Sequence, residues 1–220
     1  MTMRSQRGFT LVEIAIVLVI IGLLLGGILK GQEMITQAKI KNLIADFSGV
    51  SAAYHGYQDR YRAIPGDDPG AAARWAVAPA AVSGNGNGVV GGTYNVSPCV
   101  LATESCSFWD HLRRAGFVAG TGPLQPFNAV TGFIGVQTGN GAVAPAAALG
   151  GFVSLLLCSA NLPDKMAIAV DTQMDDADAR TGTVRGQLHA AGPNPAINAA
   201  ADAANYAETG TNVYTLCRAL

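Results

Sequence analysis

The chain begins with a short polar stretch that is followed by an unbroken apolar one. Residues 1–8 carry two arginines, and residues 9–29 contain only Thr10 and Glu13 as strongly polar side chains. In an α-helix, the stretch 9–29 would extend over about 31 Å, the thickness of a bilayer's hydrocarbon core. The pattern therefore predicts a membrane-spanning helix close to the N-terminus.

A second helical pattern continues directly from the apolar stretch. Apolar residues recur every three or four positions, and charged or amide side chains fall mostly between them. These apolar positions are Ile40, Leu43, Ile44, Phe47, Val50, Tyr54, Tyr57 and Tyr61. Because Pro65-Gly66 ends the pattern, we expect one helix over about residues 10–61, with an amphipathic second half that packs on a sheet. The three tyrosines then belong to the buried face rather than to a stacking platform.

The remainder of the chain alternates short elements with loops. Residues 64–92 are rich in Pro, Gly, Ala and Asn, which predicts a loop. The expected elements after it are a helix over 105–115, strands over 133–136, 152–158, 183–189 and 213–217, and a helix that starts at Pro163. Residues 190–211 fit either a loop or a weak helix.

Composition and motifs argue against several functional classes. The formal net charge is −1 and the basic residues are scattered, so no basic stripe for nucleic acid is present. The glycine-rich run 84–88 lacks the Gly-Lys-Ser/Thr ending of a phosphate-binding loop. The isolated histidines His55, His111 and His189 form no recognisable catalytic motif, so we expect no enzyme. The acidic residues Asp67, Asp68 and Asp110 are expected in a turn and on a helix surface.

The apolar stretch is expected to remain in the mature protein as an anchor. Arg4 and Arg7 precede it, which places the N-terminus in the cytoplasm. A cleaved secretory signal has a shorter apolar stretch and then a small-x-small site, which residues 30–33 do not provide. A carboxylate at the centre of a span costs about 2–3 kcal/mol, so Glu13 is a candidate functional residue. Its natural partner would be a charged Phe9 amine released by cleavage after Gly8.

The string from Gly8 to Glu13, with its basic leader and apolar span, resembles the type IV prepilin motif. In that family a membrane peptidase cleaves after the glycine and methylates the new N-terminal phenylalanine. The glutamate helps to align incoming subunits with the filament. The resemblance therefore implies cleavage between Gly8 and Phe9, methylation of Phe9, and roles for Phe9 and Glu13 in filament assembly. Unlike many relatives, this chain has glycines but no proline within the apolar stretch.

The resemblance implies an α+β, pilin-like fold, in which a long N-terminal helix packs on a small antiparallel sheet. Residues 1–8 would be a cleaved leader and residues 9–29 a transmembrane segment and assembly helix. Residues 30–62 would form the amphipathic half of the same helix, and residues 63–220 a globular head with the sheet and disulfides.

The implied function is that of a structural subunit of a type IV pilus-like filament. Its partners would be identical or homologous pilins, a prepilin peptidase that also methylates, an inner-membrane platform protein, an assembly ATPase and the membrane. It would span the bacterial inner membrane once, with a periplasmic head, and then enter an extracellular pilus or a periplasmic pseudopilus. The alternatives are a pseudopilin of type II secretion and an anchored binding module that does not polymerise.

Four cysteines lie after the anchor, which indicates two disulfides in an oxidising compartment. Of the three possible pairings, Cys99–Cys106 and Cys158–Cys217 are favoured. The first closes a short loop, and the second joins two expected strands and ties down the C-terminus, as C-terminal cystines do in many pilins. Zinc is disfavoured because the chain has no Cys-x-x-Cys motif.

Several aspartates lie near the C-terminal end of the helix that is expected to start at Pro163. Negative charge is unfavourable there, because the helix dipole is negative at its C-terminus. Arg180 and Arg185 are expected to compensate their charge. Some type II secretion pseudopilins bind calcium near the C-terminus. The alternative is therefore a calcium site formed by Asp175, Asp176 and Asp178. The string fails the EF-hand pattern, because Arg180 replaces an acidic ligand and no closing glutamate follows. We therefore expect no cofactor.

Overall fold

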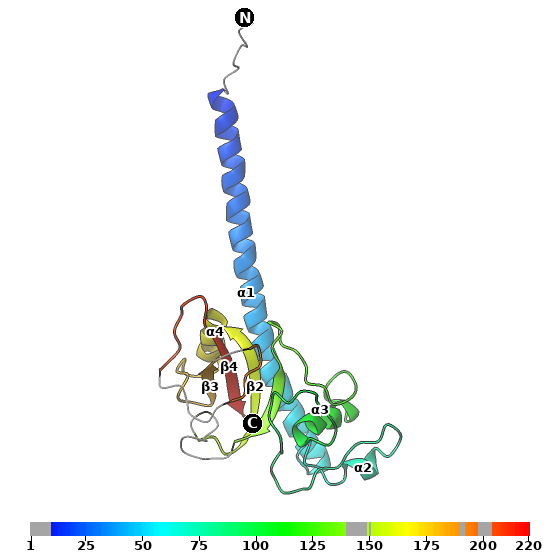
Figure 1. Ribbon diagram of the computed structural model, residues 1–220. Coiled ribbons are helices and arrows are strands. Elements are labelled where there is room, and N and C mark those ends of the chain that lie inside the picture. Colours follow the sequence, from blue (N-terminus) through cyan, green and yellow to red (C-terminus); the bar gives the residue numbers. More distant parts are fainter. Residues whose placement is uncertain (1–9, 140–148, 150, 190–191, 198–203) are drawn as a thin grey trace, which may run out of the picture. The chain divides into compact units, whose positions relative to one another are not determined.

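The computed structural model describes the chain except for residues 1–9, 140–148, 150, 190–191 and 198–203 (Figure 1). By its internal contacts the chain forms two compact units, residues 1–38 and 39–220. The elements, in chain order, are α1 (Leu11–Tyr61), α2 (Ala71–Arg74), α3 (Glu104–Arg114), β1 (Ile134–Thr138), β2 (Leu155–Pro163), α4 (Asp164–Met174), β3 (Val184–Leu188) and β4 (Val213–Ala219). This is the α+β, pilin-like architecture predicted from the sequence.

The N-terminal part of α1 is apolar and solvent-exposed in the isolated chain. It is long and apolar enough to cross a membrane, and none of that stretch is buried. The helix continues without a break through Gly22, Gly26 and Gly27, although glycine costs about 1 kcal/mol relative to alanine in a helix. The glycines therefore do not interrupt the helix here.

The C-terminal part of α1 supplies one wall of the head's core. Its buried residues follow the predicted spacing of three and four and are Ile40, Leu43, Phe47, Val50, Ala53, Tyr54 and Tyr57. The amphipathic second half is thus confirmed, and Tyr54 and Tyr57 belong to the core as expected. After Tyr61 the helix ends at Arg62, whose positive φ of 54° turns the chain out of the helical path.

A four-stranded antiparallel sheet packs against this part of α1 in the order β1-β2-β4-β3. One of its faces meets α1 through residues such as Val136, Leu157 and Leu216, and the other carries a smaller cluster around Cys158 and Cys217. In Figure 1 the strands β2, β4 and β3 lie on one side of this half of α1, and α2 and α3 lie on the other. The head is therefore built around the helix that leads to the anchor.

The short elements agree with the sequence predictions to within a few residues. All four expected strands are present, as are the helix expected over 105–115 and the one expected after Pro163. The short helix α2 was not predicted and lies inside the expected loop. Residues 190–211 are partly outside the described residues, and those that are described form neither helix nor strand.

Candidate functional site

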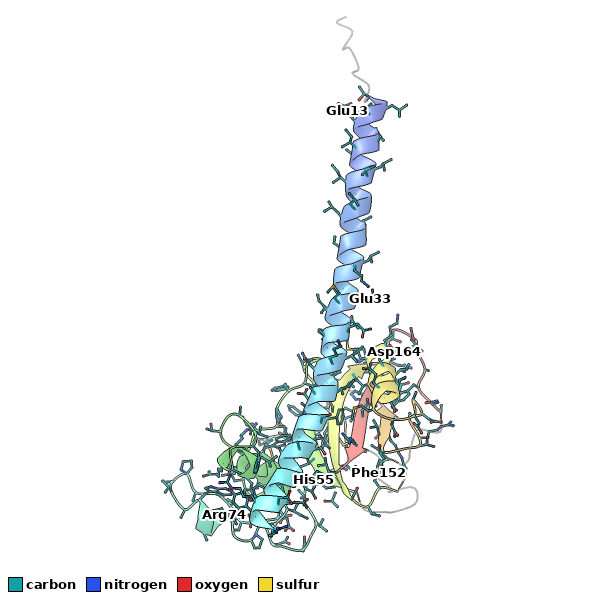
Figure 2. The ribbon with its side chains drawn as sticks, turned by 180° about the vertical axis from the view of Figure 1, so that it is seen from behind. Glu13, Glu33, His55, Arg74, Phe152 and Asp164 are labelled. Carbon is teal, nitrogen blue, oxygen red and sulfur yellow. A yellow bond between two sulfur atoms is a disulfide. The ribbon has the colours of Figure 1, made fainter. Side chains whose placement is uncertain are left out.

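The first turn of α1 contains a reciprocal hydrogen-bonded pair between Thr10 and Glu13. The Thr10 backbone N–H and hydroxyl each donate to Glu13 Oε2 at 2.8 Å, and the Glu13 N–H donates to Thr10 Oγ1 at 3.3 Å. This is a capping box, in which the first and fourth residues satisfy each other's exposed groups at a helix start. Figure 2 shows Glu13 at this end of the helix.

The capping box gives the Glu13 carboxylate a partner within its own chain. A carboxylate in the first helical turn is also favoured by the helix dipole. Thr10 was not identified as a site residue from the sequence, although Thr-x-x-Glu before an apolar run signals this motif. Gly8 and Phe9 lie outside the described residues, so the cleavage position, the methylation and the Phe9–Glu13 pairing stay predictions.

Apart from Glu13, the stretch 11–29 of α1 presents large apolar side chains to its surroundings. Leu11 is 87% exposed and Leu23 is 74% exposed. A shallow apolar groove runs beside the small side chain of Ala15, and it is lined by Leu11, Val12, Ala15, Ile16, Val19 and Ile20. A surface of this kind needs lipid or other helices around it, because apolar area of this extent is unfavourable in water.

Within residues 39–220, buried polar groups join the end of α1 to the loop that follows it. The Tyr57 hydroxyl donates to Asp68 Oδ2 at 2.6 Å, and Arg74 Nη1 donates to the same oxygen at 2.5 Å. Burial opposes ionisation of Asp68, but the hydrogen bonds from Tyr57 and Arg74 outweigh it and lower its pKa. Burial, together with the same carboxylate, raises the pKa of Tyr57. The contacts of Asp68 with Tyr57 and Arg74 therefore hold the loop against the end of α1.

The glycine-rich run 84–88 wraps around the neighbouring carboxylate, Asp67. Gly86 N–H donates to Asp67 Oδ1 at 2.6 Å, and Gly88 N–H donates to Oδ2 at 2.7 Å. Asn87 N–H adds a longer bond of 3.3 Å to Oδ1. Successive backbone amides of this kind form an anion-binding nest. The nest is occupied by a side chain of the same chain, and Asp67 lies in a turn as predicted.

Asp110 and His111 occupy buried positions on α3. Asp110 is 1% exposed and pairs with Arg114 at 2.6 Å, so its expected place on the helix surface was wrong. The sequence could not reveal that loop residues would cover this side of the helix. His111 accepts from Gly66 N–H at 2.9 Å through Nδ1, and its Nε2 lies 2.8 Å from the Val82 carbonyl oxygen. Burial lowers the pKa of His111, which favours the neutral ring that these two contacts require.

The other two histidines have ordinary surroundings. His55 is exposed on α1, and its ring contacts Tyr54. His189 Nε2 lies 2.6 Å from the Thr215 hydroxyl, and burial lowers its pKa. Among the described residues, neither histidine is joined to a carboxylate in a relay.

The cysteines form the disulfides Cys99–Cys106 and Cys158–Cys217, which is the pairing favoured from the sequence. Cys158 and Cys217 are directly opposite each other on β2 and β4. The second bond therefore ties the last strand of the chain to the centre of the sheet.

The aspartates after α4 hold the loop that leads to β3. Asp171, Asp175 and Asp176 bring one oxygen each within 4.8 Å of the others. Each already accepts hydrogen bonds from the protein: Asp171 from the Tyr206 hydroxyl, Asp175 from Val184 N–H and Asp176 from the Thr181 hydroxyl. Each of the three carboxylates therefore has a hydrogen-bond donor within the protein, and calcium binding stays an untested alternative.

The third aspartate of the sequence-based set is separate from that cluster. Arg180 binds Asp178 through two nitrogens and lowers the pKa of that carboxyl to about 2. Arg180 therefore compensates one of the acidic groups, as expected. Arg185 donates to the carbonyl oxygens of Gly182 and Leu149.

A family model matches the start of the chain. The model of the prokaryotic N-terminal methylation motif matches residues 3–29. No curated protein and no solved structure matches the chain. Together with the α+β, pilin-like fold, the motif supports a type IV pilin-like or pseudopilin precursor.

The motif carries several general consequences for this chain. It implies processing by a prepilin peptidase and assembly with other pilin subunits. Proteins of this class are structural subunits rather than enzymes. The apolar part of α1 fits a membrane-anchored pilin.

Proposed function

We propose that the chain is a structural subunit of a type IV pilus-like filament. It enters the inner membrane as a prepilin, with its N-terminus in the cytoplasm and its head in the periplasm. The peptidase cleaves after Gly8 and methylates Phe9, and the subunit then polymerises through its N-terminal helix. The observation that carries this proposal is the exposed apolar start of α1, which contains a single carboxylate, Glu13, next to the cleavage position.

During assembly this helix moves from lipid into a bundle of identical helices. Lipid tails are as apolar as leucine, so burying Leu11 or Leu23 against another helix gains little from the hydrophobic effect. A charged contact in a low-dielectric surrounding is stronger and has a defined direction. Glu13, released from Thr10 or shared with it, would meet the charged Phe9 amine of a neighbouring subunit and set the axial register.

Assembly by this route requires other proteins to supply energy. The sequence shows no nucleotide-binding motif. We therefore propose that an assembly ATPase supplies the energy and acts through an inner-membrane platform protein. We assign no catalytic step and no cofactor to the chain itself.

The proposal is tested by Glu13→Ala with Glu33→Ala as the matched control. Glu33 lies on the same helix, is exposed, and pairs only with the exposed Lys30 at 2.8 Å among the described residues. We expect both variants to be cleaved, and only Glu13→Ala to be missing from assembled filaments. Cleaved Glu13→Ala protein that enters filaments at the wild-type level would contradict the role of Glu13.

The location of the assembled protein separates the pilus from the alternatives. Mature protein in material sheared from the cell surface supports the proposed pilus. Mature protein that stays in the periplasm, together with loss of protein secretion in a deletion strain, would identify a type II secretion pseudopilin. Mature protein that crosslinks to no other copy would identify an anchored module that does not polymerise.

A further inference from the structure

A cavity of about 440 Å³ opens beside the last turns of α3. Its lining comes from four segments and consists of Pro79, Leu101, Asp110, Arg113, Arg114, Gly120, Thr121, Gly122 and Pro123. Small-molecule sites in proteins have volumes of about 300–1,000 Å³, are mostly apolar and carry a few fixed polar groups. This cavity has both properties, and no step of filament assembly uses it.

The charged side chains that line the cavity have a net positive charge. Arg114 binds Asp110 through Nε at 2.6 Å and donates to the Pro79 carbonyl oxygen through Nη2 at 2.6 Å. Arg113 has no carboxylate partner among the described residues and is held by carbonyl oxygens instead, through Nη1 to Gly122 at 2.6 Å and to Leu124 at 2.7 Å. One aspartate and two arginines leave one positive charge on the wall.

Each guanidinium also keeps an amino group without a partner. Within the described part of the chain, Arg113 Nη2 and Arg114 Nη1 make no hydrogen bond. Arg113 is partly buried, and this burial lowers its pKa. An arginine keeps its proton at physiological pH, so a carboxylate placed against these amino groups would stabilise its charge.

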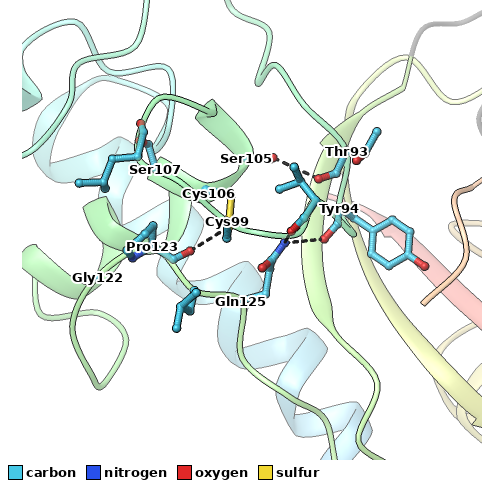
Figure 3. The surroundings of a disulfide bond; sticks show 12 residues. Thr93, Tyr94, Cys99, Ser105, Cys106, Ser107, Gly122, Pro123 and Gln125 are labelled. Atoms are coloured by element: carbon cyan, nitrogen blue, oxygen red, sulfur yellow. Dashed lines mark hydrogen bonds between the residues drawn. A yellow bond between two sulfur atoms is a disulfide. The ribbon is translucent and has the colours of Figure 1, made fainter. Parts of the chain in front are cut away.

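The part of the lining that carries Leu101 and Pro123 is held in place by a disulfide and by contacts to carbonyl oxygens. The Cys99–Cys106 disulfide joins the loop that carries Leu101 to α3, and the Ser107 hydroxyl donates to the Leu101 carbonyl oxygen at 2.5 Å. Cys99 Sγ lies 3.2 Å from the carbonyl oxygen of Pro123. A dashed line marks this contact in Figure 3. A preformed pocket loses less conformational entropy when it binds than one that must be ordered first.

We propose that this cavity binds a small organic carboxylate. The carboxylate lies against the free amino groups of Arg113 and Arg114, because the planar guanidinium matches the geometry of a carboxylate. The apolar body of the ligand packs on Pro79, Leu101 and Pro123. The head would then carry a ligand-binding function in addition to its role in a filament.

Titration calorimetry on the full chain in nanodiscs of zwitterionic lipid tests this, with benzoate as the probe. Benzyl alcohol is the neutral analogue and phenyl phosphate the second anion. We expect benzoate to bind about tenfold or more tightly than benzyl alcohol, the ratio for one charge-assisted hydrogen bond. No heat with benzoate up to millimolar concentrations, equal binding of benzyl alcohol, or binding of phenyl phosphate alone would overturn the proposal.

Two variants locate the site. Arg113→Gln is expected to weaken benzoate binding about tenfold or more, and the matched control Arg60→Gln is expected to leave it unchanged. Arg60 is exposed on α1, and its contacts among the described residues are a long hydrogen bond of 3.4 Å to the Ala115 carbonyl oxygen and a cation–π contact with the Tyr61 ring. Because Arg113→Gln also removes contacts to the loop, Thr121→Trp is the second variant. Thr121 is exposed at the cavity, so tryptophan there should fill the cavity, keep both arginines and abolish binding. Unchanged binding in folded Thr121→Trp would contradict the assignment.

Discussion

The two disulfides should contribute unequally to the stability of the head. Cys99–Cys106 closes a separation of 7 residues and Cys158–Cys217 one of 59. The chain-entropy relation gives about 2.4 kcal/mol for the shorter loop and about 4.2 kcal/mol for the longer one. Replacing both cysteines of a pair by alanine removes two buried sulfur atoms in each case. The packing losses are therefore similar, and the difference of about 2 kcal/mol reports loop length.

The assay is guanidinium unfolding of the full chain in neutral detergent, without reducing agent. Both tryptophans, Trp75 and Trp109, lie within residues 39–220, so their fluorescence follows the head and not the anchor. We expect C158A/C217A to lose clearly more unfolding free energy than C99A/C106A. An equal or reversed order would refute the reasoning, as would a Cys106–Cys158 peptide in a non-reducing digest.

Three further predictions concern the polar groups of the head. Asp67→Ala should lower the unfolding free energy by about 2–4 kcal/mol, because it leaves three loop amides without their acceptor. The control Asp59→Ala, at an exposed position, should change it by less than about 0.5 kcal/mol. Denaturant unfolding measures both variants, and equal losses would contradict the nest. The pKa of His111 is lower in the folded state, so the unfolded state binds more protons, and stability should fall as pH drops below about 6.5. Unfolding curves at several pH values should show this slope reduced in His111→Gln, and an unchanged slope would exclude the buried histidine as its source. Calcium or a chelator should leave the melting temperature unchanged, since the carboxylates near Asp175 already have partners; a rise with calcium would reverse that interpretation.

Most of the helices and strands followed from local sequence patterns, and their pilin-like arrangement followed from the family resemblance. The spacing of three and four from Ile40 to Tyr57 identified the buried face of α1, because a helix that packs on one side must repeat in this way. The strands were found because short apolar segments were separated by turn residues. The helix α2 was missed since its four residues are too few for a periodic pattern.

Functional residues could be predicted only where a short stretch of sequence marks them. Glu13 stood out because a lone carboxylate interrupts an apolar run, and Thr10 should have stood out as the start of a capping box. The burial of Asp110 depends on loop residues distant in the chain, which no local pattern contains. The cavity beside Arg113 likewise arises from four separate segments that only the folded chain brings together.

The central claim is that the chain is cut after Gly8 and assembled through the new N-terminus. Mass spectrometry of the N-terminal peptide from sheared filaments tests it most directly. We predict a peptide that begins with methylated Phe9 and continues through Thr10 to Glu13. A peptide that begins at Met1, or at any residue other than Phe9, in assembled filaments would contradict the account.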